Sequence, residues 1–277
     1  MSSGAEASSV TPNGAPLLEA RHLRKAFPLS GVAWQDSHHG THAVEDVSLA
    51  ITRGETFGIV GESGCGKTTL ARMLLRLIEP DSGEIRFAGE NWLAASGVQM
   101  RKIRRRMQIV FQDPMASLDP RMRVEATVGE PLEIHEPQLS REERRMKIIE
   151  ALGTVGLGVD VLPRYPHEFS GGQRQRIGIA RALILRPDLV VADEPVSSLD
   201  VSIGAQILEL LERLQREFSL TLLLISHNLP VVALLASRVA VMQAGRFVET
   251  GPAARVLGSP EHAYTKTLLA AVPRLPS

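Results

Sequence analysis

The fold is decided by residues 57–69, which read FGIVGESGCGKTT. An apolar strand pattern runs into G-x-x-x-x-G-K-T, and apolar residues then recur at helical spacing from Leu70 to Leu77. A glycine-rich loop between a strand and a helix cradles phosphates with backbone N–H groups, and the helix dipole favours the same negative charge. The pattern therefore predicts a nucleoside triphosphate site, against the alternative of a glycine-rich turn that holds no ligand.

Each part of this P-loop has an expected task. The glycines let the backbone curl, Lys67 would reach the β- and γ-phosphates, and the Thr68 hydroxyl would ligate Mg²⁺. Cys65 lies at a helix start beside a lysine, where cation and dipole favour the thiolate, but we interpret it as a tolerated small residue with no chemical role. The predicted nucleotide-binding residues of the loop are Gly61, Glu62, Ser63, Gly64, Cys65, Gly66, Lys67, Thr68 and Thr69.

Composition excludes several classes of protein. The chain has 277 residues, 44% of them hydrophobic, and its 31 basic residues balance 31 acidic ones, so no overall charge draws it to nucleic acid or anionic lipid. One cysteine excludes an intrachain disulfide framework. The first residues lack the basic and apolar regions of a signal peptide. No apolar run has the roughly 18 residues of a membrane helix. We expect a cytosolic protein.

Strand and helix patterns alternate along the chain, which predicts an α/β fold with a mostly parallel sheet and helices on both faces. Residues 29–42 are expected to form a loop between two strands of a hairpin. Its histidines, His38, His39 and His42, could suggest a metal site, but their spacing fits no standard one and a solvated loop is the better interpretation. Strands are predicted over 17–23, 44–51, 57–60, 84–87, 107–111, 189–192, 221–225, 238–243 and 246–249, and helices over 127–134, 142–152, 174–185, 202–218 and 263–272.

A second motif follows another apolar strand, as Asp193 and Glu194. An aspartate at the carboxyl end of a parallel strand can hold Mg²⁺. The neighbouring glutamate can act as general base on the attacking water. Taken alone, an acidic pair in this position is often a plain helix start, but after a P-loop it predicts ATP hydrolysis.

The stretch FSGGQ at residues 169–173 predicts a second anion cradle, made of a serine N-cap, two glycine amides and a helix dipole. An ordinary helix cap is the alternative. The segment resembles the LSGGQ signature of ABC-type ATPases, with Phe169 in place of leucine. Other motifs of that family follow the same order: Gln112 resembles the Q-loop glutamine, residues 197–200 the D-loop and His227 the switch histidine. Phe27 stands where the family stacks an aromatic ring on adenine.

The resemblance covers about residues 17–275 and implies the ABC ATPase fold, with an antiparallel β subdomain and a helical subdomain that carries the signature. It also implies that two subunits pair head to tail, so that the signature of one closes over ATP on the P-loop of the other. Glu194, His227 and Gln112 would be catalytic, and Thr68, Gln112 and Asp193 would ligate Mg²⁺. The signature and D-loop residues expected to contact nucleotide are Ser170, Gly171, Gly172, Gln173 and Asp200.

Longer phrases resemble ATPase subunits of oligopeptide, dipeptide and nickel importers, above all the second, "F-type" subunit. They lie at 110–122, 129–132, 164–173 and 259–269. Such a subunit would pair with a second ATPase subunit, either a different chain or a second copy of this one. The pair would work with two membrane permeases and an extracytoplasmic solute-binding protein, at the cytoplasmic face of the inner membrane. Peptides are the expected solute, with nickel or another small solute as the alternative, and residues 112–136 would receive a permease helix.

We expect residues 1–16 to be disordered and residues 17–277 to form one ABC ATPase domain. Within it, residues 17–111 and 186–255 would form the RecA-like core and β subdomain, 112–185 the helical subdomain, and 256–277 a tail. The competing class, an ABC protein of DNA repair or translation, usually carries paired cassettes, coiled coils or basic linkers. The sequence shows no such feature and has no net charge, so no nucleic-acid partner is expected.

Overall fold

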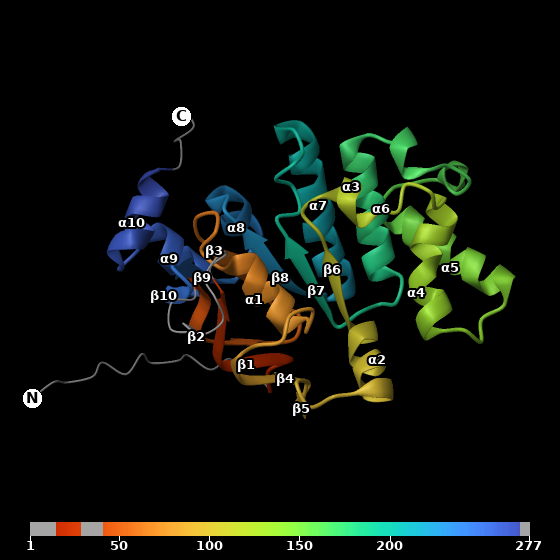
Figure 1. Ribbon diagram of the computed structural model, residues 1–277. Coiled ribbons are helices and arrows are strands. Elements are labelled where there is room, and N and C mark those ends of the chain that lie inside the picture. The colour runs from red at the N-terminus through yellow and green to blue at the C-terminus, as the bar shows by residue number, and fades with distance from the viewer. Residues whose placement is uncertain (1–14, 29–40, 272–277) are drawn as a thin grey trace, which may run out of the picture.

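Residues 15–28 and 41–271 are described by the computed structural model, and they form two sheets flanked by helices (Figure 1). The smaller, antiparallel sheet has the strand order β2-β1-β4-β5 and the larger one β10-β9-β3-β8-β7-β6. The strands are β1 Leu18–Phe27, β2 Thr41–Ile51, β3 Thr56–Val60, β4 Ser82–Phe87, β5 Glu90–Asn91, β6 Met107–Val110, β7 Leu189–Asp193, β8 Thr221–Ser226, β9 Arg238–Gln243 and β10 Arg246–Pro252.

The larger sheet is parallel except at one edge. β6, β7, β8, β3 and β9 run parallel, while β10 returns antiparallel to β9 through the turn at Ala244 and Gly245. Both turn residues have positive φ, as a tight hairpin turn requires. The predicted α/β fold with a mostly parallel sheet is confirmed, and so is the additional antiparallel β sheet.

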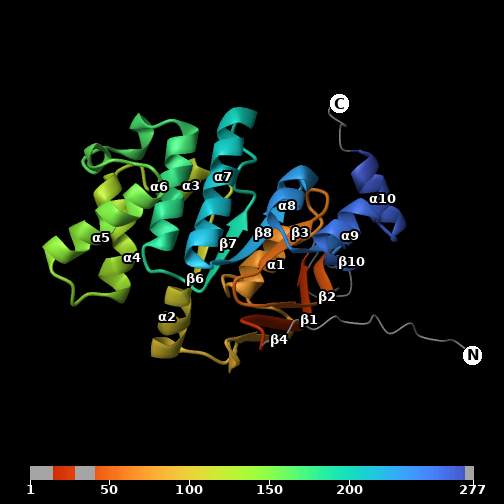
Figure 2. The same cartoon turned by 180° about the vertical axis from the view of Figure 1, so that it is seen from behind.

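Helices cover both faces of this sheet. They are α1 Lys67–Leu74, α2 Gly97–Arg106, α3 Pro114–Ser117, α4 Val124–His135, α5 Arg141–Thr154, α6 Gly171–Leu183, α7 Val201–Phe218, α8 Leu229–Leu235, α9 Ala253–Gly258 and α10 Ala263–Ala270, with 3₁₀ turns at Val159–Val161 and Pro166–Glu168. Figures 1 and 2 agree that α3 to α6 gather at one end of the molecule and α9 and α10 at the other.

The core is divided between the two faces of the parallel sheet. Along β8, Leu223 and Ile225 face a cluster shared with α1 and the antiparallel sheet, whereas Leu222 and Leu224 face one shared with the helices from α4 to α9. Strands buried on both faces read as continuous apolar runs, because every side chain meets a helix or a second sheet.

Several expectations differ from the structure at element ends. β2 begins at Thr41. Of the loop expected at 29–42, the structure therefore describes only the last two residues, which belong to this strand. His38 and His39, considered above for a metal site, lie outside the described residues. The helix expected from residue 174 begins at Gly171, since Ser170 supplies a capping box. Sequence patterns missed α3, α8, α9 and the short β5. The expected disorder of residues 1–16 falls almost entirely outside the described range.

Candidate active site

The loop after β3 curls as its glycines predicted. Gly61, Gly64 and Gly66 have φ of 156°, 82° and 111°, and the N–H of Cys65 donates to the Glu62 carbonyl at 3.3 Å. Gly66 is the N-cap of α1. The loop therefore ends where free helix N–H groups and the dipole favour an anion.

Two backbone carbonyls press on this loop from neighbouring strands. A Cβ on Gly66 would lie 1.9 Å from the carbonyl oxygen of Ala43 in β2, and one on Gly61 would lie 2.2 Å from that of Met242 in β9. Both positions exclude a side chain by contact as well as by φ. The remaining predicted loop residues Glu62, Ser63 and Gly64 are exposed, and Thr69 is half-buried in the first turn of α1.

The Lys67 ammonium is held at the centre of the loop. Its Nζ donates to the carbonyl oxygens of Gly61 at 2.7 Å and Glu62 at 2.8 Å, and the residue is only 5% exposed. A buried ammonium needs such acceptors. The positive charge is thus fixed beside the loop amides, where phosphate oxygens would bind.

Cys65 differs from the expectation of a favoured thiolate. Burial raises the pKa of its thiol and outweighs the opposing effect of the Lys67 charge. The sulfur lies under Gly61, where a Cβ would approach it to 2.8 Å, and the side chain packs against the core cluster next to α1. Burial keeps the thiol protonated, in agreement with a small packing residue.

Thr68 and Asp193 bring two oxygen ligands together from α1 and the end of β7. The Thr68 hydroxyl donates to Asp193 Oδ1 at 3.3 Å. Burial raises the pKa of Asp193, and the charge of Glu194 acts in the same direction. A bound cation would offset that cost, and hydroxyl and carboxylate oxygens are the ligands that hard divalent cations prefer. The pair fits such a cation.

Glu194 is held by its backbone and by His227. Its φ is +48°, and its N–H donates to the carbonyl of Ile225 in β8 at 2.8 Å. Its Oε2 lies 2.9 Å from His227 Nδ1, and the glutamate side chain is 11% exposed against 50% for the histidine. Because an ionised carboxylate only accepts, the imidazole donates in this pair. The sequence placed both residues in one site but gave no sign of this hydrogen bond.

Gln112 follows β6 and touches the D-loop. The hydroxyl of Ser198 donates to the Gln112 carbonyl at 3.3 Å, and the Gln112 side chain is exposed. The structure therefore joins two segments that are 86 positions apart. The carboxyl ends of β3, β6, β7 and β8 together carry the P-loop, Gln112, the acidic pair and His227, as expected for a parallel sheet.

The signature residues form the capped start of α6. The N–H of Gln173 donates to the Ser170 hydroxyl at 3.3 Å, and Gln173 Oε1 accepts from the Ser170 N–H at 3.1 Å. A Cβ on Gly172 would lie 2.3 Å from Ile203 Cγ2, and one on Gly171 3.0 Å from Leu199 Cδ2. These glycines let α6 pack closely on the start of α7.

Asp200 caps α7 within its own chain. Its Oδ1 accepts from the Ile203 N–H at 3.0 Å and from the Ser202 hydroxyl at 2.9 Å, and the backbone N–H donor is the main reason that the pKa of this carboxyl is lowered. The cap fixes the end of the D-loop at the start of α7. In this chain the described contacts of Asp200 are therefore those of a helix cap.

Phe27 is the last residue of β1 and is 39% exposed. The Nζ of Lys25 lies 5.8 Å from the centroid of its ring. In the hairpin register it pairs with Thr41, two residues before the Ala43 carbonyl that presses on Gly66. The register thus places Phe27 opposite the start of the strand whose Ala43 carbonyl contacts the P-loop. The structure also brings to the loop a residue that sequence patterns missed: the hydroxyl of Tyr264 in α10 accepts from the Glu62 N–H at 3.2 Å.

The family model described as ABC transporter matches residues 44–197, more than half of the chain. The chain belongs to the ABC transporter family. It is 48% identical over 262 residues to the oligopeptide transport ATP-binding protein AppF of Bacillus subtilis strain 168, covering 94% of this chain and 79% of that one. It is 49% identical over 259 residues to the oligopeptide transport ATP-binding protein OppF of Salmonella typhimurium, covering 93% and 78%.

Solved structures of ABC cassettes have the same fold. The cassette MJ0796, described as a dimer in a post-hydrolysis state bound to ADP and Pi, superposes with a TM-score of 0.75 at 28% identity, covering 85% of this chain and 98% of that one. CbiO1 of Clostridium perfringens, part of the transporter complex cbiONQ, gives 0.75 at 29% identity, covering 88% and 91%. This chain is accordingly an ABC transporter ATPase, which binds and hydrolyses ATP.

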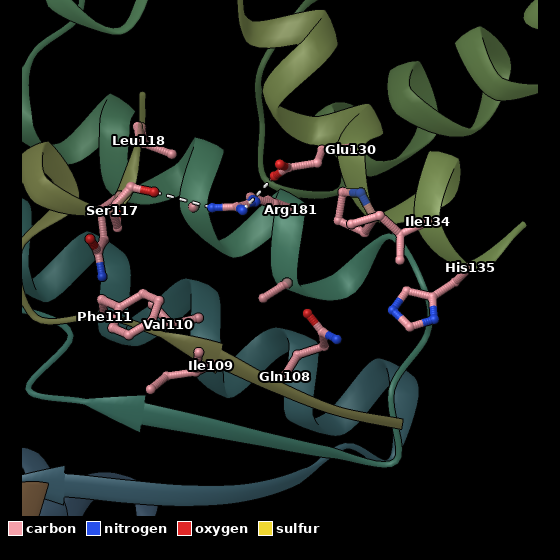
Figure 3. Close-up of a pocket in the computed structure, with 14 residues that line it drawn as sticks. Gln108, Ile109, Val110, Phe111, Ser117, Leu118, Glu130, Ile134, His135 and Arg181 are labelled. Carbon is pink, nitrogen blue, oxygen red and sulfur yellow. Dashed lines mark hydrogen bonds and ion pairs between the residues drawn. The ribbon is translucent and has the colours of Figure 1, made fainter. Parts of the chain in front are cut away.

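The ABC ATPase has a groove at the start of its helical part, between β6, α4 and α6 (Figure 3). It encloses about 200 Å³. Arg181 spans one end, with its guanidinium donating to Glu130 Oε2 at 2.6 Å and to the Ser117 carbonyl at 3.1 Å, as the dashed lines in Figure 3 mark. Gln175 lines the groove, and its Nε2 is a buried donor with no hydrogen-bond partner within the described part of the chain.

None of the helices described for this ABC ATPase combines the length and the apolar character that a membrane crossing requires.

Proposed function

We propose that this chain is the ATP-hydrolysing subunit of an ABC importer for oligopeptides or dipeptides. The observation that carries the proposal is the identity of 47–49% to oligopeptide and dipeptide transport ATP-binding proteins over at least 93% of this chain, including a dipeptide subunit of Haemophilus influenzae. Such identity extends well beyond the motifs that all ABC ATPases share.

The site geometry supports a division of roles in hydrolysis. Lys67 and the amides of the P-loop would bind the phosphates, and the hydroxyl of Thr68 with the carboxylate of Asp193 would hold Mg²⁺, joined by Gln112. When bound, Mg²⁺ neutralises charge on the β- and γ-phosphate oxygens. Phe27 would stack on the adenine from the edge of β1.

Glu194 would act as general base on the attacking water and His227 would hydrogen-bond the γ-phosphate. Their 2.9 Å contact supports a shared site, because it sets the base beside the group expected to touch the phosphate. The backbone of Glu194 is also fixed by the bond from its N–H to the Ile225 carbonyl, which sets the point from which its side chain extends.

We further propose that two ATPase subunits pair head to tail. Ser170, Gly171, Gly172 and Gln173 would bind the γ-phosphate held on the partner's P-loop. The exposed, capped start of α6 supports this, since it offers a hydroxyl and helix N–H groups to an anion outside its own chain. Asp200, beside it, would lie in the same interface. The dimer reported for MJ0796 is a precedent for two cassettes pairing.

The groove between β6, α4 and α6 would receive a cytoplasmic helix of a permease. It begins beside Gln112, so a helix seated there would act on the segment that reaches the nucleotide. The unpartnered Nε2 of Gln175 supports this, because a buried donor without an acceptor is costly unless a partner supplies one. Two permeases and an extracytoplasmic solute-binding protein would complete the importer at the cytoplasmic face of the membrane.

A second solute class has one specific observation in its favour. The chain is 46% identical over 265 residues to the glutathione import ATP-binding protein GsiA of Pectobacterium atrosepticum, of which it covers 42%. Glutathione is itself a small peptide, so the same motor would serve either solute. Nickel remains an expectation from sequence resemblance alone.

Affinity purification of the tagged full-length chain from detergent-solubilised membranes tests the proposal. We expect two membrane proteins and a second ATPase chain to co-purify, and the assembly to hydrolyse ATP faster when peptide-loaded binding protein is added. Recovery with DNA or ribosomes and without membrane proteins would contradict it.

A further inference from the structure

The tail of the chain reaches back to the P-loop. α10 lies at the β10 end of the molecule, and its Tyr264 accepts a hydrogen bond from the Glu62 N–H at 3.2 Å, although the two residues are 202 positions apart (Figure 1). Burial raises the pKa of the Tyr264 hydroxyl, so it stays protonated at neutral pH. A residue of the tail is thus in direct contact with the P-loop.

The contact falls on a peptide group that also holds the lysine. The peptide between Gly61 and Glu62 has its C=O bound to Lys67 Nζ at 2.7 Å and its N–H bound to Tyr264 at 3.2 Å. A trans peptide is a rigid plane with these two groups on opposite sides. Fixing the N–H therefore fixes the direction of the carbonyl, and with it the position of the ammonium.

α10 is firmly attached to the sheet on which it rests. The Glu249 carboxylate in β10 accepts from the backbone N–H groups of Glu261 at 3.0 Å and His262 at 3.1 Å, just before α10 begins. Glu249 is 9% exposed, and Tyr264 packs against the core cluster. The hydroxyl is thus presented by an anchored helix, as a positioning group must be.

We propose that Tyr264 is a positioning residue for ATP binding: its hydroxyl holds the Gly61–Glu62 peptide and so sets Lys67 for the phosphates. The inference rests on the proposed role of the P-loop. Once ATP is bound, its phosphates hold Lys67 directly, so Tyr264 acts mainly on the affinity and little on the rate of hydrolysis.

The test is Tyr264→Phe in the full-length chain, titrated with Mg-ATP by isothermal calorimetry. Loss of one hydrogen bond to a loop N–H is expected to raise Kd about three- to tenfold. In the assembled transporter KM should rise by a similar factor while kcat stays within about twofold of wild type. Thr267→Ala is the matched control, since it removes an exposed hydroxyl of the same helix that donates to the Ala263 carbonyl within α10.

A Kd for Tyr264→Phe equal to that of wild type would overturn the proposal, as would an equal rise for Thr267→Ala. Glu249→Gln separates positioning from general stability. It should raise Kd in the wild-type background and have no further effect in the Tyr264→Phe background, because the anchor acts through the hydroxyl. Additive effects would contradict this. Lys67→Ala distinguishes a failure of this inference from a failure of the proposed function. If this variant bound Mg-ATP normally, the assignment of the P-loop as the phosphate site would itself be wrong.

Discussion

Gly66 shows how one residue fixes the phosphate loop. Its φ of 111° disfavours any side chain, and the Ala43 carbonyl occupies the place of a Cβ. Gly64 shares the positive φ but has no atom within 4 Å of such a Cβ. At Gly64 a side chain would therefore meet only backbone strain, whereas at Gly66 it would meet backbone strain and a steric clash.

Gly64→Ala is expected to lower the free energy of unfolding by about 1–2 kcal/mol, the cost of the left-handed conformation. Gly66→Ala should lower it by about 3 kcal/mol or more and weaken Mg-ATP binding further, because β2 or the loop must move as well. Urea denaturation of the two variants checks this. Equal losses of stability would contradict the contact between Gly66 and Ala43.

At the residue scale the motif predicted the loop but not its surroundings. The curl at Gly61, Gly64 and Gly66 follows from the spacing of the glycines alone. The protonated state of Cys65 does not, because burial under Gly61 comes from packing that involves β9 and α1. The contact of Tyr264 with Glu62 also has no local signal, since it depends on how β10 carries the tail back across the sheet.

Helix α6 and helix α7 are brought together at the signature glycines. The 2.3 Å approach between a Cβ on Gly172 and Ile203 Cγ2 leaves no room for a methyl group, and the branched Ile203 cannot turn aside without a strained rotamer. The close packing therefore sets the position of Ser170 relative to the D-loop.

Gly172→Ala is expected to destabilise the chain by about 1–3 kcal/mol through overpacking. Adding Ile203→Ala removes the opposing methyl, so the double variant should be more stable than the sum of the two single changes predicts. Thermal and urea unfolding of the four proteins measure this coupling. Strict additivity would show that α6 and α7 do not meet at this point.

Long helices and strands were predicted well from their periodic patterns, and short ones were not. The run at 202–218 gave α7 nearly to its ends, and the apolar runs at 189–192 and 221–225 gave β7 and β8. The helix Leu229–Leu235 was not predicted, because seven residues cannot establish a helical period. β5 has two residues, too few for any pattern.

Over the whole molecule, the order of strands explains why distant motifs share one site. β3 lies between β8 and β9, and β7 between β8 and β6, so motifs 132 positions apart such as Gly61 and Asp193 end on the same sheet edge. The sequence predicted a mostly parallel sheet with motifs at the ends of its strands, but it did not predict the order of those strands. The division into a core, a helical part at 112–185 and a tail from 256 stays a prediction.

The central claim is that Glu194 activates water in a nucleotide site that this chain completes with a partner. Glu194→Gln keeps the shape of the side chain and removes its basicity. The matched control is Glu209→Gln, at an exposed position of α7.

The most direct test compares these two variants in the assembled transporter. It measures their Mg-ATP binding and their steady-state ATP hydrolysis. For Glu194→Gln the account predicts a Kd within about twofold of wild type, hydrolysis reduced by about 100-fold or more, and an ATP-dependent dimer that persists. Glu209→Gln should behave as wild type. Hydrolysis by Glu194→Gln at the wild-type rate would contradict the catalytic role of Glu194.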